Sequence, residues 1–391
     1  MADFLKNWID RDMSQSIPGT PIDAAHLGRF APSVTSVEPQ YLQPSGQNGF
    51  KVTADFYAKI IDSDSVHQIY GISSDLTVAS AASLLDTGDA LQAGKDYYVY
   101  LCEASGGAEL VVSLNATYPA GYTAQNSRKI GGFHTLCAAA GTISGHPLSG
   151  YAAGAILPLS FWTLLHRPVS EPEGMVWISG IGKWVDIYLN SVSSGKLVSV
   201  YGGTIADGAS ATKFNGEKFV EWLGQVGKRP LYRNEFMVAA KGSNEETNIA
   251  GSADPDTAGG HTDTGGRRMI SSYGLEDCCG VLWQWGADLY ESYNGKGTSW
   301  KTTGNSETYT EGSMKYNLDG YSWKKESVYH PDFDAQSYGS CNGLLRRVLL
   351  GGPWDGGSLC GSRCAYCSYF SSYGWTNRAV RGAAEPRAVN L

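Results

Sequence analysis

Tryptophans placed close to glycines constrain the fold of this chain more than any other feature. The stretch GVLWQWGADLY contains Trp283 and Trp285, and the stretch LLGGPWDGG contains Trp354 two residues after the pair Gly351-Gly352. Paired glycines let two backbones approach each other closely. We therefore expect the three tryptophans to be core aromatics with no catalytic role.

The composition of the whole chain favours turns and short strands over long helices. Of the 391 residues, 49 are glycine, 42% are hydrophobic and 17% are charged. A chain of this length is expected to form two or three domains with real cores. We expect no membrane insertion, because no apolar run reaches the ~20 residues that a spanning helix needs. The N-terminus MADFLKNWIDRDM lacks the apolar region of a secretory signal, which predicts synthesis in the bacterial cytoplasm without a signal peptide.

Charge and metal-ligand patterns argue against two classes of partner. The net charge is −8 and no block of Lys or Arg exceeds a pair, whereas nucleic-acid recognition usually requires a basic footprint. The seven histidines are scattered, and the eight cysteines are expected to be free buried thiols. Cys360, Cys364 and Cys367 lack the second ligand pair of a zinc ribbon. We therefore expect no nucleic acid, no metal and no cofactor.

Three segments are expected along the chain. Residues 1–46 are predicted to be an N-terminal arm for attachment, because a helical stretch with an apolar face is followed by a polar stretch punctuated by prolines. Residues 47–158 contain FKVTADFYAKII, KDYYVYLCEA and AELVVSLNA, which predict an all-β domain of sandwich type. Residues 159–391 mix short strands with one predicted helix, KFNGEKFVEWLGQVG. The apolar face of the arm consists of Phe4, Leu5, Trp8 and Ile9.

The polar stretch 287–345 has no hydrophobic periodicity, which indicates a functional loop or a disordered one. Two roles stay open for its tyrosines: they widen a binding surface, or they pack over the core. These tyrosines are Tyr290, Tyr293, Tyr309, Tyr316 and Tyr321.

A segment near the C-terminus, CAYCSYFSSYGWTNR, interleaves large aromatics with serines. Tyr366, Tyr369 and Tyr373 have helical spacing, which would suit the buried stripe of a helix. However, the serines and Gly374 lower helix propensity, and each buried tyrosine hydroxyl would need a partner. The mixture of Tyr, Ser, Gly, Asn and Trp is typical of an antibody-like binding surface. We favour the exposed binding surface over the buried stripe.

Three stretches of the C-terminal segment together resemble the signature of the C-type lectin fold, in the variety found in formylglycine-generating enzymes. They are GKRPLYRNEFMVAA, GVLWQWGADLY and LLGGPWDGGSLCGSRCA with the later VRGAAEPR, in the order and spacing of that family. The resemblance implies an α+β class, with a lectin domain over 159–391 after the β-sandwich domain and the arm. It implies a small twisted antiparallel sheet and two helices. We expect Arg381 to be a structural arginine with satisfied hydrogen bonds.

From about Ala93 to its end the chain more specifically resembles the receptor-binding proteins that determine the host tropism of Bordetella phage and are diversified by a retroelement. The resemblance rests on AGKDYYVYLC, GYTAQNSRKIGGFH, RPVSEPEGM, WVDIYLNSV and IADGASATKF. It implies a virion protein at a tail-fibre tip, not an enzyme, whose variable region (about 350–380) binds a host-cell receptor that is a protein. It also implies a homotrimer, which gains avidity from several sites, joined to other tail proteins by the arm.

Two departures from the family concern the first 45 residues, which do not resemble its N-terminal β-prism, and the loop at 290–345, which is longer. The variable positions carry over without a gap between Arg363 and Arg381. Apart from Trp375, their residue types are reachable from an asparagine codon by changing its adenines. The implied ligand-binding residues are Pro353, Asp355, Gly356, Gly357, Leu359, Tyr366, Ser368, Tyr369, Tyr373, Trp375, Asn377 and Arg378.

Three other functions compete with receptor binding on a phage. Cys360 and Cys364 lie close to where formylglycine-generating enzymes hold the pair that oxidises a substrate cysteine with copper, and thiolates suit that chemistry. They are one residue closer together than that pair, and the upstream β domain has no place in such an enzyme. A calcium-dependent sugar lectin would need an EPN or QPD tripeptide and a WND, and the chain has neither. The third is a cell-surface variable adhesin that no phage carries.

Overall fold

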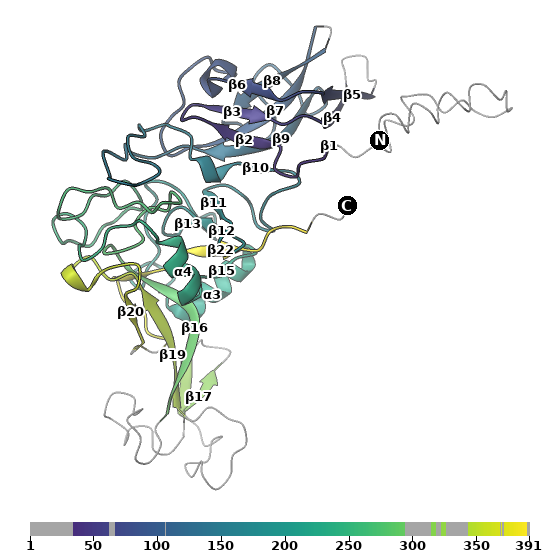
Figure 1. Cartoon of the computed structure of the whole chain (residues 1–391). Helices are drawn as coiled ribbons and strands as arrows, with labels where there is room; N and C mark the ends of the chain where they lie inside the picture. The colour runs from purple at the N-terminus through teal and green to yellow at the C-terminus, as the bar shows by residue number, and fades with distance from the viewer. Residues whose placement is uncertain are drawn as a thin grey trace, which may run out of the picture. The chain divides into compact units, whose positions relative to one another are not determined.

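Two units make up the part of the chain that the computed structural model describes. The first holds the described residues up to Gln92, with Asp96–Thr135 and Phe161–His166, and the second holds Ala93–Lys95, Leu136–Ser160 and the described residues from Arg167 onward (Figure 1). None of the described helices is long and apolar enough to cross a membrane. The described residues are 34–61, 67–105, 107–293, 314–317, 322–325, 343–367, 369 and 371–388.

Antiparallel sheets form the first unit. One consists of β1 (Val34–Ser36), β4 (Phe56–Ile61) and β5 (His67–Ile72), and a second of β2 (Leu42–Ser45), β3 (Gly49–Val52) and β6 (Leu76–Val78). The third has the order β10 (Trp162–Thr163), β9 (Ser127–His134), β7 (Asp96–Ala104) and β8 (Gly107–Ser113). Burial alternates along β4, as expected for a strand with one covered face. The strands predicted from the three hydrophobic runs are confirmed as β3, β4, β7 and β8.

The first unit starts within the segment expected to be an N-terminal arm. Strands β1 and β2 belong to its sheets, and Tyr41, just before β2, is fully buried. The Tyr41 hydroxyl donates a 2.5 Å hydrogen bond to the carbonyl of Ile130, and its ring packs on Phe56. Residues 1–33, including the predicted apolar face of the arm, lie outside the described residues.

The end of the first unit also differs from the predicted boundary near residue 158. Leu136–Ser160 packs with the second unit, and the chain then returns to the first unit at Phe161–His166. Phe161 is fully buried there and its ring lies 5.3 Å from that of Phe133. The core of the first unit is therefore completed by a short strand, β10, that follows an excursion into the second unit.

Two four-stranded sheets and two helices organise the described part of the second unit. The antiparallel sheet has the order β11 (Met175–Ile178), β12 (Lys183–Asp186), β22 (Gly382–Ala384) and β15 (Arg229–Pro230). The other sheet has the order β20 (Ala365–Tyr366), β19 (Gly343–Leu350), β16 (Trp283–Tyr293) and β21 (Arg378–Ala379), and β21 runs parallel to β16. The expected antiparallel sheet is therefore joined by a mixed one. The hairpins are β13 (Ser191–Ser193) with β14 (Lys196–Val198), and β17 (Met314–Asn317) with β18 (Ser322–Lys325).

The predicted helix forms as α3 (Gly216–Gln225). Asn215 caps its start by accepting a hydrogen bond from the backbone N–H of Lys218. Gly227, with φ +73°, follows its end, and the buried face includes Phe219 and Leu223. A second helix, α4 (Arg233–Ala239), begins where Glu235 accepts a hydrogen bond from the backbone N–H of Tyr232.

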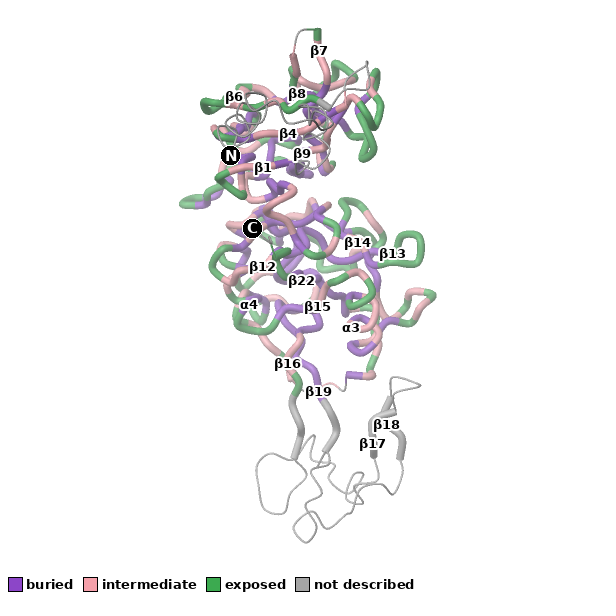
Figure 2. The backbone as a smooth tube through the Cα atoms, turned by 90° about the vertical axis from the view of Figure 1, so that its right-hand side faces the viewer, coloured by how far each residue is buried: buried purple, intermediate pink, exposed green. Residues whose placement is uncertain are grey.

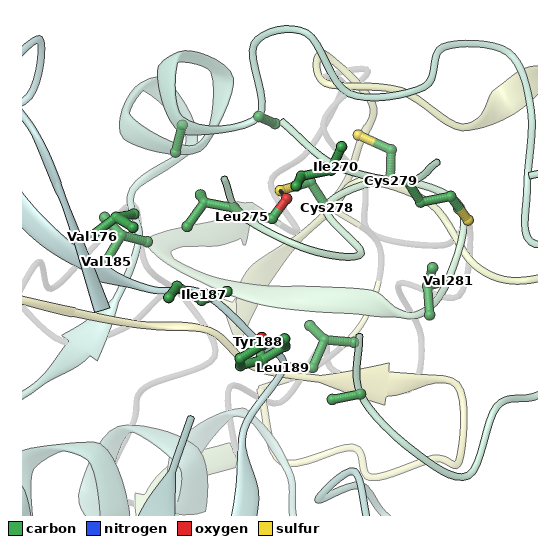
Figure 3. Close-up of a cluster of buried hydrophobic side chains, with 14 of the residues drawn as sticks. Val176, Val185, Ile187, Tyr188, Leu189, Ile270, Leu275, Cys278, Cys279 and Val281 are labelled. Carbon is green, nitrogen blue, oxygen red and sulfur yellow. Dashed lines mark hydrogen bonds between the residues drawn. The ribbon is translucent and has the colours of Figure 1, made fainter. Parts of the chain in front are cut away.

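A large apolar cluster fills the centre of the second unit, and a smaller one, which includes Phe219 and Trp285, packs around α3. The large cluster gathers side chains from β11 and β12 with those of the loop that precedes β16, among them Ile187, Leu275 and Cys278 (Figure 3). The residues of β22, which directly follows Arg381, are buried (Figure 2). Arg381 is 1% exposed. Its guanidinium donates to Gln284 Oε1 and to the carbonyls of Asp186, Ile187 and Glu276, so the expected structural role is confirmed.

The polar stretch 287–345 is strand at both of its ends. Strands β16 and β19 pair as far as Tyr293 and Gly343, so the loop expected from the sequence is shorter. Tyr290 lies on β16 and Tyr316 on β17. Tyr309 and Tyr321 lie outside the described residues, and the two roles considered for these tyrosines stay predictions.

Candidate ligand-binding surface

The aromatic segment near the C-terminus connects the two edges of the mixed sheet. It begins at β20, where Tyr366 pairs with Leu349, and ends at β21, where Arg378 pairs with Trp283. Because β20 and β21 lie on opposite edges of the sheet, the residues between them cross from one edge to the other. The described residues of this crossing form turns and extended chain. The alternative of a buried helical stripe is therefore wrong.

Four rings of this segment form a continuous row, which we call the aromatic row: Tyr366, Tyr369, Tyr373 and Trp375. Successive ring centroids lie 5.2, 5.4 and 6.1 Å apart, and the last two pairs are nearly parallel. Tyr366, Tyr373 and Trp375 are 41%, 40% and 54% exposed, and Tyr369 is half-buried. The row therefore offers a large apolar surface with phenol hydroxyls along it, as binding surfaces rich in tyrosine do.

Main-chain carbonyls hold the segment to the scaffold. The backbone N–H of Arg347 donates to Tyr369 O, that of Gly208 to Trp375 O and that of Trp283 to Asn377 O, at 3.4, 3.1 and 3.0 Å. The side-chain amide of Asn215, at the start of α3, donates to Ser372 O at 3.2 Å. Every residue type has a carbonyl, so these four anchors do not depend on the side chains of the segment.

Two glycines allow the segment to lie close to the scaffold. A Cβ on Gly374 would lie 2.6 Å from the carbonyl oxygen of Phe214, and a Cβ on Gly208 would lie 2.2 Å from the backbone nitrogen of Trp375. Sequence reasoning missed Gly208, because it lies 167 positions before Trp375 and no local pattern connects the two.

Replacing Gly208 by alanine is expected to break its hydrogen bond to Trp375 and to displace that ring. The added methyl group would overlap backbone atoms, which must shift, and overpacking of this kind costs about 1–3 kcal/mol. Thermal unfolding and the fluorescence of Trp375, isolated by comparison with a Trp375→Phe variant, measure both effects. Gly224→Ala is the matched control, since a Cβ there meets nothing within 4 Å and it lies inside α3. An unchanged Trp375 signal in Gly208→Ala would contradict the prediction.

The other predicted binding residues differ in exposure. Asp355 is exposed and Leu359 is 76% exposed on the short helix η4 (Gly357–Leu359). Pro353, Gly356, Gly357 and Asn377 are half-buried, and Ser368 lies outside the described residues. Arg378 is only 2% exposed. The expectation that Arg378 contacts a ligand directly is therefore wrong: its charged group lies beneath the aromatic row.

Acidic residues surround the C-terminal end of the row. Partial burial raises the pKa of Asp254, a hydrogen bond to Thr376 opposes this shift, and the charges of Asp207, Asp256 and Asp355 raise it further. Thr376 directly follows Trp375. The surface beside Trp375 is therefore rich in carboxyl groups.

The predicted core tryptophans are not equally buried. Trp285 is 1% exposed, and Trp354 is half-buried against the central cluster. Trp283 is also half-buried, and its ring lies 5.9 Å from that of Tyr366. The expectation of a core position is thus confirmed for Trp285, while Trp283 forms part of the support of the aromatic row.

The two cysteines of the enzyme alternative are poorly suited to form thiolates. Burial raises the pKa of Cys360 to about 12, and the charges of Cys364 and Asp355 add to the shift. Burial also raises the pKa of Cys364. Both are free thiols. A nucleophile or soft-metal ligand needs the thiolate form, which these surroundings disfavour.

At pH 8 Cys360 is expected to react with iodoacetamide only slowly in the folded protein. A thiol with a pKa near 12 is ionised in roughly one molecule in ten thousand at that pH. Mass spectrometry of the alkylated peptide, with urea-unfolded protein as the control, measures the difference. Labelling as fast in the folded as in the unfolded protein would show an activated thiol and favour the enzyme.

The described fold is mostly β with few helices, and its second unit presents an exposed aromatic surface. It resembles solved structures of the Major Tropism Determinant, a C-type lectin-like fold. The M1 variant is 24% identical with a TM-score of 0.70, covering 95% of this chain and 90% of its own, and the U1 variant is 24% identical with a TM-score of 0.68, covering 91% and 86%.

Two sequence comparisons then identify the family. The family described as the Mtd second domain matches residues 40–163. A tail fiber receptor-binding protein of Bordetella phage BPP-1 is 30% identical over 319 residues, which cover 76% of this chain and 72% of that protein. This chain belongs to the same family of phage tropism determinants, and the resemblance inferred from the sequence is confirmed. The relative from Bordetella phage BPP-1 is named as a receptor-binding protein.

Proposed function

We propose that this protein is the receptor-binding protein at the tip of a phage tail fibre, and that it binds a protein on the host-cell surface through a diversified surface centred on the aromatic row. One observation carries the proposal most strongly. The segment is held by carbonyls at Tyr369, Ser372, Trp375 and Asn377, while the side chains of Tyr366, Tyr373 and Trp375 are exposed. Such a segment can carry many different side chains and keep the same backbone conformation.

The proposed contact residues follow from exposure. Tyr366, Tyr373, Trp375, Asp355 and Leu359 would meet the ligand directly, because they are the most exposed of the predicted positions. Pro353, Gly356, Gly357, Tyr369 and Asn377 would shape the surface around them.

The proposal also covers the types of the domains, the oligomeric state and the attachment to the phage. They are an α+β lectin-type domain carrying the variable region, a β-sandwich domain before it, a homotrimer, and attachment to other tail proteins through the N-terminal segment. Family membership and the mostly β fold support them. Trimerisation would raise avidity by presenting several copies of a weak site together.

The DNA beside the gene provides the test of diversification. We expect a near-copy of the codons for residues 350–380 that differs at adenines, next to a gene for a reverse transcriptase. Tail genes in the same neighbourhood would support a phage, and their absence would favour a cell-surface adhesin. A locus with no such copy, and no variation at these codons among sibling isolates, would contradict diversification.

A further inference from the structure

Arg378 lies beneath the aromatic row and touches three rings. Its guanidinium carbon lies 3.9 Å from the ring centroid of Tyr369, 4.7 Å from that of Tyr373 and 5.9 Å from that of Trp285. Two of these rings belong to the row, and the third is buried in the scaffold. The guanidinium therefore bridges the row and the core.

The backbone of Arg378 is fixed by the sheet. It starts β21 and pairs with Trp283 of β16, and the carbonyl of the preceding residue accepts a hydrogen bond from Trp283. The side chain is 2% exposed, so it cannot swing to solvent without disturbing the rings above it. The sheet therefore sets the position of this cation, and the burial of the side chain sets its orientation.

The surroundings of Arg378 are unusual for a buried cation. No carboxylate in the described part of the chain forms an ion pair with it, and its Nε and Nη1 atoms have no hydrogen-bond partner there. Burial lowers the pKa of Arg378, and the nearby tyrosines oppose the shift. Burying a charge without an opposite charge is unfavourable for folding. The faces of the aromatic rings and a hydrogen bond with the side chain of Tyr369 offset this cost.

We infer that Arg378 is a positioning residue for the binding surface: its guanidinium holds Tyr369 and Tyr373 in a fixed, nearly parallel arrangement and connects them to Trp285. The inference deepens the proposed function and rests on it, since ring placement matters for the ligand only if the row binds one. A cation attracts the face of any aromatic ring, so the same support would serve Phe, Tyr or Trp at positions 369 and 373.

This role separates ring order from stability. A buried charge that no carboxylate pairs with is costly to desolvate, and an apolar side chain of similar length removes that cost. Arg378→Met is therefore expected to unfold at a temperature no lower than the wild type, although the rings above it lose their order. If Arg378 had a merely structural role, Arg378→Met would instead unfold at a lower temperature while the rings kept their order.

The experiment compares Arg378→Met with Arg363→Met, a matched control at an exposed arginine of the same region. We expect Arg378→Met to lose the part of the near-ultraviolet circular dichroism that a Tyr373→Ala variant also loses, and acrylamide to quench Trp375 more strongly, with Trp375→Phe defining that residue's contribution. Arg378→Lys keeps a cation and is expected to restore part of both signals. Arg363→Met is expected to match the wild type throughout.

Native spectra in Arg378→Met would overturn the inference, and so would a variant that fails to fold or unfolds at a lower temperature. These spectra need no ligand, so they test ring placement alone. Adhesion to bacterial cells that bind the wild type tests the proposed function. If Tyr373→Ala adheres like the wild type while Arg378→Met has altered spectra, the proposed function fails and the positioning of the rings stands.

Discussion

Arg381→Met is expected to prevent folding of the second unit. The buried guanidinium satisfies the side chain of Gln284 and the carbonyls of Asp186, Ile187 and Glu276. The Ile187 carbonyl keeps the backbone N–H of Glu276 as a donor. Each of the other three buried acceptors, left without a donor, costs roughly 1–3 kcal/mol, and together they approach the about 5–15 kcal/mol that stabilises a typical domain. Circular dichroism and denaturant unfolding of the purified variant measure the loss.

The control for Arg381→Met is Arg387→Met, a change at an exposed arginine six positions further on. Exposed substitutions usually alter stability by within about 0.5 kcal/mol, so this control should fold normally. A folded Arg381→Met protein with wild-type resistance to urea would show that the three deprived acceptors find other donors, and the structural role assigned to this arginine would be wrong.

Alanine at Tyr373 and Trp375 together is expected to abolish adhesion while leaving the melting temperature nearly unchanged. Both rings are exposed, and the rings of Tyr369 and Trp285 still contact the guanidinium of Arg378, so their removal costs little stability. Central aromatics of a binding surface each contribute about 2 kcal/mol or more, which is roughly a thirtyfold change in affinity for each ring. Flow cytometry of labelled protein on bacterial cells that bind the wild type provides the measurement.

Tyr118→Ala is the matched control for this double variant, because Tyr118 is 41% exposed but belongs to the first unit. It should adhere like the wild type. Two results would argue against the binding surface. One is undiminished adhesion of the double variant, and the other is a loss of adhesion that parallels a loss of stability.

The sequence predicted best those features that depend on neighbouring residues. Helix α3 follows from the apolar face of the stretch KFNGEKFVEWLGQVG and the glycine after its end, and the strands of the first unit follow from their β-branched and aromatic runs. Arg381 and Trp285 were recognised from ordered motifs whose glycines and tryptophans must meet in one core. In each case the information lies within a short stretch or in a fixed order of stretches.

Features that depend on distant partners were harder to predict. Tyr41 looked like part of an arm because its hydrogen-bond partner, Ile130, lies 89 positions away. Arg378 looked like a surface residue because charged side chains are rarely buried, and only the folded crossing places aromatic rings above it. Trp283 looked like a core residue. In the structure it pairs with the edge strand β21, and its ring packs against the ring of Tyr366.

The spacing of the carbonyl anchors has a consequence for the length of the segment. Donors from four separate places in the scaffold meet carbonyls at positions 369, 372, 375 and 377. Removing or adding one residue between them would shift every later carbonyl away from its donor, whatever the side chains. Exchanging residues in this segment therefore leaves its anchors in place, whereas an insertion or deletion here would detach the segment from its scaffold.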